Sequence, residues 1–105
     1  SLEDHYVHWG DDGLKDSEAF YEQFKKSDGY WEYDVHPYKT TSWYPHSSTK
    51  RSEGLYEIKE TPDGRFNNYE TSQYREWDQN EKQSIEKLYD VKQNSNGIWD
   101  SLLIS

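Results

Sequence analysis

Aromatic side chains supply most of the hydrophobic material of this chain, and this feature constrains the fold more than any other. The 105 residues include 10 Tyr, 5 Trp and 3 Phe, against 14 Ala, Val, Ile and Leu together. Trp and Tyr each bury roughly 150–250 Å² and keep a polar tip that needs a partner. Aromatic residues favour strands, whereas a helical bundle would need Leu and Ala. The composition therefore predicts a β-rich fold.

The chain is also strongly acidic. It has 21 Asp and Glu against 12 Lys and Arg, a formal net charge of −9. Few aliphatic residues combined with a high net charge is typical of disorder, but the aromatic residues replace the missing apolar area, so we expect one folded domain over residues 1–105. An acidic surface disfavours direct binding to nucleic acid or to an anionic membrane. No apolar run is long enough to span a membrane, and no membrane insertion is expected.

The chain contains neither Cys nor Met. Disulfides, thiolate metal sites and Cys nucleophiles are therefore excluded, and the absence of a phosphate-binding loop or a nucleotide motif predicts no cofactor. The content of Tyr, Asn, Ser and Lys favours an exported bacterial protein over a cytosolic phage protein. The chain begins at Ser1, which fits the earlier removal of a signal peptide, a lipoprotein leader or a tag.

One segment, from Asp16 to Lys26, has the pattern of a helix. Asp16 is an N-cap residue followed by an acidic first turn, and a glycine lies just beyond the last turn. Phe20, Tyr21 and Phe24 fall on one face at helical spacing. The sequence therefore predicts a short helix that must pack against other elements, because three turns are not stable alone.

The rest of the sequence predicts strands joined by tight turns. A Pro-Asp-Gly turn and an Asn-Gly turn each lie between two β-rich runs, which is the pattern of two antiparallel hairpins. Loss of alternation near Ser72 predicts a bulge or a change of face. We expect no internal repeat, a polar connection over residues 78–82, and the longest loop over residues 39–53. The expected strands are residues 5–9, 30–36, 55–60, 65–77, 85–93 and 97–104.

These elements predict an α+β, β-rich fold with one N-terminal helix packed on a meandering antiparallel sheet. The sheet has five to six strands and is either open or curled into a barrel. Alternation in the strands places one set of side chains toward the helix. The expected core consists of Trp31, Tyr33, Val35, Tyr56, Ile58, Tyr89 and Val91, covered by Phe20 and Phe24.

Two prolines stiffen the stretch from His36 to His46, which holds three aromatic residues. One interpretation is a rigid aromatic recognition loop, because such side chains lose little entropy on binding. The other is a loop folded over one end of the sheet with Trp43 in the core. A second acidic and aromatic group surrounds Trp77. The candidate binding residues are Trp43, Tyr44, His46, Glu76, Trp77 and Asp78.

The absence of a catalytic motif favours a non-enzymatic protein. The first hypothesis is a small binding protein, such as an inhibitor or an immunity protein, whose acidic and aromatic surface recognises a basic protein partner. A weaker alternative for a local site is metal binding by His5 and His8 with a neighbouring carboxylate.

Two resemblances add alternatives. A helical part before an antiparallel sheet resembles the barnase-like microbial ribonucleases, and this resemblance implies a secreted hydrolase that uses Glu32, His46 and Arg51 as base, acid and phosphate ligand. Only in that case would the chain bind nucleic acid. The stretch Gly29-Tyr30-Trp31 resembles the start of lipocalins and other calycins, which implies a barrel closed by Trp31 and a small-molecule ligand.

Overall fold

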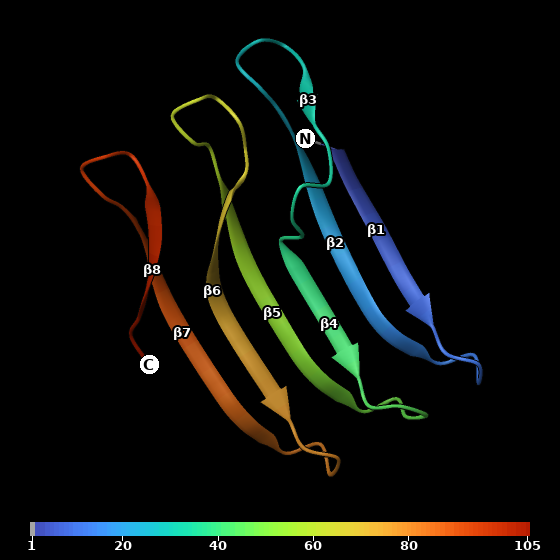
Figure 1. Cartoon of the computed structure of the whole chain (residues 1–105). Coiled ribbons are helices and arrows are strands. Elements are labelled where there is room, and N and C mark those ends of the chain that lie inside the picture. Colours follow the sequence, from blue (N-terminus) through green and yellow to red (C-terminus); the bar gives the residue numbers. More distant parts are fainter. Residues whose placement is uncertain (1) are drawn as a thin grey trace.

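The protein is a single open antiparallel β-sheet, described by a computed structural model over residues 2–105 (Figure 1). The sheet has eight strands, and the hydrogen-bonded order is β1-β2-β4-β5-β6-β7-β8, with β3 paired to β2. The strands are β1 (Leu2–Trp9), β2 (Lys15–Lys25), β3 (Trp31–Glu32), β4 (Lys39–Trp43), β5 (Lys50–Lys59), β6 (Asn68–Trp77), β7 (Gln83–Gln93) and β8 (Trp99–Leu103).

The described residues contain no helix, so the prediction of an α+β fold was wrong and the fold is all-β. The segment expected to be helical is strand β2, which pairs with β1 on one side and with β4 on the other. Phe20 stacks on His5 at a ring-centroid distance of 4.3 Å, while Tyr21 meets Tyr6 at 5.4 Å on the opposite face. Ladders to β1 along most of the strand and to β4 over residues 17–20 satisfy backbone groups of β2, whereas a helix of about three turns is not stable alone.

The sheet is larger than the expected five to six strands and does not close into a barrel, because β1 and β8 lie at its two edges. Residues 39–53, expected to form a long loop, form β4 and the start of β5 around a turn. Residues 78–82 are the turn of the β6–β7 hairpin rather than a connection between hairpins. The strand expected over residues 30–36 is reduced to β3, since the backbone leaves the sheet near Asp34, which has a φ of 43°.

Several local predictions are confirmed. The Pro-Asp-Gly turn joins β5 to β6, the Asn-Gly turn joins β7 to β8, and a strand occupies the N-terminal segment. The bulge expected near Ser72 is present, because the register passes from Leu55–Gln73 to Tyr56–Thr71 and leaves Ser72 unpaired. The hydroxyl of Ser72 donates to the carbonyl of Leu55 at 3.2 Å. Turn and bulge signals are local, so they survive a wrong choice of fold class.

Contrary to expectation, the chain is built from three copies of one unit. Residues 15–31, 50–66 and 83–99 align without a gap, and each covers the second strand of a hairpin and the turn that follows it. A unit consists of this segment, the strand before it in the hairpin (β1, β4 or β6), and the residues that follow it up to the next hairpin strand. A sequence period of this length is the signature of a repeat architecture, in which each unit packs on its neighbours. The positions shared by all three copies are Glu18, Glu53 and Glu86, then Tyr21, Tyr56 and Tyr89, and then Gly29, Gly64 and Gly97.

The expected core does not exist, since no hydrophobic side chain among residues 2–105 is buried. Tyr33 is 62% exposed and Val35 is 43% exposed. Residues 2–105 measure 45 × 32 × 15 Å, so within this part of the chain one layer presents both faces to solvent and no second layer covers either face. Apolar contact comes instead from aromatic pairs between neighbouring strands and hairpins, such as Phe24 with Phe66 at 4.6 Å.

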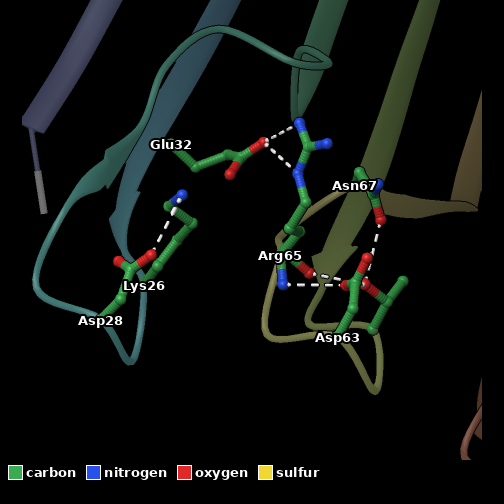
Figure 2. A network of polar contacts seen from close by, with 7 residues as sticks. Lys26, Asp28, Glu32, Asp63, Arg65 and Asn67 are labelled. Atoms are coloured by element: carbon green, nitrogen blue, oxygen red, sulfur yellow. Dashed lines mark hydrogen bonds and ion pairs between the residues drawn. The ribbon is translucent and has the colours of Figure 1, made fainter.

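Polar contacts also join neighbouring hairpins, at the end of the sheet that holds the β2–β3 and β5–β6 turns (Figure 2). The Arg65 guanidinium donates to Oε1 of Glu32 from Nη2 at 2.9 Å and from Nε at 3.3 Å. Glu32 is only 7% exposed, so its carboxylate depends on this partner. The contact joins the first unit to the second.

Candidate functional site

Three tryptophans lie at equivalent positions along one end of the sheet. Trp9, Trp43 and Trp77 are the last residues of β1, β4 and β6, and each precedes a hairpin turn (Figure 1). We call these tryptophans and the turns over residues 10–14, 44–49 and 78–82 the tryptophan edge. A register shift precedes each tryptophan in its ladder, so the same irregularity recurs in all three units. Such recurring bulges re-aim the side chain that follows them.

Lysines lie between neighbouring tryptophans. The ammonium of Lys15 is 5.9 Å from the ring centroid of Trp9 and 5.8 Å from that of Trp43. The ammonium of Lys50 is 5.6 Å from the ring of Trp77. Each lysine is also held by the glutamate three residues later, at 3.1 Å for Lys15 and 3.2 Å for Lys50. The indoles and ammonium groups therefore alternate along the edge.

One hollow at this edge is acidic and aromatic, with a volume of about 410 Å³. We call it the acidic hollow. Asp11, Asp12 and Asp16 surround it together with the indoles of Trp9 and Trp43. Its other lining side chains include His8, His46 and Arg51.

Hydrogen bonds hold the carboxylates of the acidic hollow. Oδ1 of Asp12 accepts from the backbone N–H of Leu14 at 2.9 Å, and Oδ2 lies 2.9 Å from Nδ1 of His46. These contacts, the backbone bond first, lower the pKa of Asp12. Nδ1 of His8 lies 3.5 Å from Oδ2 of Asp16. The hollow holds three carboxylates against one guanidinium, that of Arg51, and this excess of negative charge favours a cationic ligand.

Two smaller hollows, which we call the repeat hollows, occupy equivalent places between neighbouring units. The first, of about 210 Å³, lies between Lys15 of the first unit and Trp43 of the second. The second, of about 300 Å³, lies between Lys50 of the second unit and Trp77 of the third. The first hollow is also lined by Trp9, Gly13, Leu14, Ser47 and Ser48, and the second by Ser48, Thr49 and Glu81.

The structure places most of the predicted binding residues at the tryptophan edge. Trp43 and Trp77 line hollows there, His46 lines the acidic hollow, and the hydroxyl of Tyr44 donates to the carbonyl of Trp77 at 2.6 Å. Asp78 stabilises its own turn, because its Oδ1 accepts hydrogen bonds from two backbone N–H groups of that turn at 2.8 and 3.0 Å. Glu76 lies next to Trp77 in β6 but lines none of these three hollows.

The ribonuclease-like set is not brought together. His46 and Arg51 line the acidic hollow, but Glu32 lies in β3 near the opposite turns, where it pairs with Arg65. The metal pair is also separated, since His5 contacts Glu18 on one face while His8 contacts Asp16. Residues three apart in a strand face opposite ways. Among residues 2–105, no group of three His, Asp or Glu side chains is placed to hold a metal ion.

Sequence reasoning missed Trp9, Lys15 and the three aspartates of the acidic hollow. The signal was present, because Trp9, Trp43 and Trp77 are each separated by 34 residues. A comparison of the chain with itself at that period would have found the edge.

Comparison with protein-family models, with curated proteins and with solved structures gave no match for this chain. The part of the chain described here has no helix with the length and apolar character needed to cross a membrane. The functional argument therefore depends on the geometry and chemistry of the tryptophan edge.

Proposed function

We propose that this chain is a non-enzymatic binding protein, such as an inhibitor or an immunity protein, that recognises a basic protein partner through its tryptophan edge. The observation that carries the proposal is the acidic hollow, which Asp11, Asp12 and Asp16 line together with Trp9 and Trp43. A lysine or arginine side chain entering this hollow meets carboxylates for its charge and indole faces for cation–π contact.

The distribution of charge supports the same partner. Residues 1–31, which make up most of the first unit, contain eight acidic and three basic side chains and so carry five of the nine surplus negative charges of the whole chain. The acidic hollow lies at the turn of this unit. A surface of one sign steers an oppositely charged partner and speeds its association.

Charge and aromatic contacts should affect different rate constants of binding. Long-range charge acts on the encounter, so raising the salt concentration should slow association strongly and change dissociation little. The bound state should instead depend on a few aromatic anchors. Replacing Trp43 with Ala should therefore raise the dissociation rate, because Trp43 lines both the acidic hollow and the first repeat hollow.

A titration with defined peptides tests the proposal. An arginine-containing peptide should quench the tryptophan fluorescence, whereas the same peptide with Glu for Arg should not. The double variant Asp11→Asn/Asp16→Asn should weaken arginine-peptide binding by about tenfold, in line with two partly exposed charge contacts. The matched control Asp90→Asn/Asp100→Asn removes the same charge from β7 and β8 and should change binding less than the first pair. Equal affinity for both peptides, or affinity that does not change with salt, would rule the proposal out.

A further inference from the structure

The two repeat hollows form a periodic surface. Each contains a lysine from one unit and the tryptophan of the next unit. The lysines lie in β2 and β5, and the tryptophans in β4 and β6, so the hollows are displaced by two strands of the sheet. Two strand spacings correspond to roughly 9.5 Å. A ligand that fills both hollows with like groups must therefore repeat at about this distance.

A polyproline II helix has this repeat. Three of its residues rise roughly 9.3 Å and complete one turn, so side chains at positions i and i+3 face the same way. A β-strand rises by a similar amount over three residues, but its residues i and i+3 face opposite ways. The spacing of the hollows thus matches the left-handed extended conformation that proline-rich segments adopt.

The chemistry of each hollow fits the same ligand. An indole face offers a flat apolar surface for a proline ring, which is how aromatic grooves recognise proline-rich segments elsewhere. The carbonyl groups of a polyproline II helix have no internal partners. The ammonium of Lys15 or Lys50 has three N–H groups, and its hydrogen bond to Glu18 or Glu53 leaves the others free to donate to such a carbonyl.

We infer that the tryptophan edge binds a proline-rich segment in the polyproline II conformation, with one proline in each repeat hollow and a flanking arginine or lysine in the acidic hollow. This inference rests on the proposed function, since it specifies which part of a basic partner is bound. Trp43 lines the acidic hollow and the first repeat hollow, so the two subsites are continuous.

Calorimetry with two peptides tests the inference. The first probe has three Pro-Pro-Ala units with an arginine at each end, and the second has Gly in place of every Pro, so the charge is unchanged. The proline peptide should bind about tenfold more tightly, because its conformation is already ordered. Trp77→Ala should remove this advantage, since Trp77 lines only the second repeat hollow of the three hollows at the edge. The ratio of the dissociation constants of the two peptides should therefore fall toward one in this variant.

Two further variants keep the test independent of folding defects. Lys50→Gln should reduce the advantage of the proline peptide without removing an indole. Trp99→Ala is the matched control, because Trp99 lies in β8 and contacts Lys59 away from the tryptophan edge. Circular dichroism should show the same strand content in all variants.

Each outcome decides between the two proposals. Equal binding of the two peptides overturns the inference and leaves the proposed function standing. Failure of both peptides to bind overturns both proposals. An oligosaccharide of β-linked glucose is a second kind of extended ligand, besides the proline peptide, that could lie along the edge. Binding of that oligosaccharide, lost in Trp77→Ala while the proline peptide shows no advantage, would replace the inference with a glycan site.

Discussion

The hydroxyl of Tyr44 donates a hydrogen bond of 2.6 Å to the backbone carbonyl of Trp77, and this bond connects the second turn of the tryptophan edge to the third. Tyr44 follows Trp43 directly in the chain, so the bond connects the backbone beside Trp43 to the backbone of Trp77, and these two tryptophans line successive repeat hollows.

Tyr44→Phe should lower the free energy of unfolding by about 0.5–1.5 kcal/mol, the usual net value of one hydrogen bond. It should also weaken binding at the second repeat hollow more than at the first. Urea denaturation measures the first effect and peptide titration the second. Tyr33→Phe is the control, because Tyr33 is 62% exposed. An equal loss in both variants would contradict the expectation.

Tyr6 should titrate well above its ordinary range. Its hydroxyl donates to Oδ2 of Asp34 at 2.6 Å, and this bond, together with partial desolvation, raises the pKa of Tyr6 from 10.0 to about 12. The folded state holds this proton more tightly than the unfolded state, so the contribution is fully present below pH 10 and is lost as pH rises toward 12. Tyrosinate absorbance measured against Tyr6→Phe checks the value, and Asp34→Ala should bring the pKa back toward 10.

His36 should make the protein less stable in mild acid. Its ring stacks on Tyr69 at 3.5 Å and meets Tyr56 at 4.9 Å, and burial lowers the pKa of His36 below 6.5. The unfolded chain then takes up this proton first, so the contribution is present above pH 6.5 and is lost as pH falls through the lower folded-state pKa. Denaturation series in urea at several pH values should show this slope. The slope should disappear in His36→Phe and persist in His8→Phe.

Gly97 should resist substitution for conformational reasons. It is the glycine of the third unit's turn, with a φ of +83°, and the nearest atom to an added Cβ would be Cγ of Pro62 at 3.6 Å. There is therefore room for a side chain but not a suitable backbone conformation. Gly97→Ala should cost about 1–2 kcal/mol, and Gly97→Asn should cost less, because Asn tolerates this region. Equal losses in the two variants would point to a steric cause instead.

The parts of the fold that depend on local sequence signals were predictable, and those that depend on pairing with a distant strand of the same chain were not. The turns at Gly64 and Gly97 follow from residues that tolerate a positive φ. By contrast, Phe20, Tyr21 and Phe24 satisfy helical spacing as well as they fit a strand, and only pairing with β1 and β4 decides between them. The expected core failed for a related reason, because alternation defines two faces but does not show whether anything covers them.

The candidate site was half predictable. The concentration of aromatic residues identified Trp43, Tyr44 and Trp77, and the structure places all three at the tryptophan edge. Trp9 and Lys15 belong to the same edge but lie in β1 and β2, where the sequence predicts a short terminal strand and a helix. The place of Trp9 and Lys15 in the edge follows only from their equivalence with residues of the later units. A search for single motifs does not compare units with one another.

The absence of a buried interior in the described sheet also determines how this protein should unfold. Each hairpin is held by the hairpins beside it, so its stability is a nearest-neighbour quantity, as in a one-dimensional array. The outer strands β1 and β8 have a neighbour on one side only. Amide hydrogen exchange should therefore be slowest in β4, β5 and β6 and become faster toward both edges, and the unfolding transition should be broader than an all-or-none transition of a chain this long.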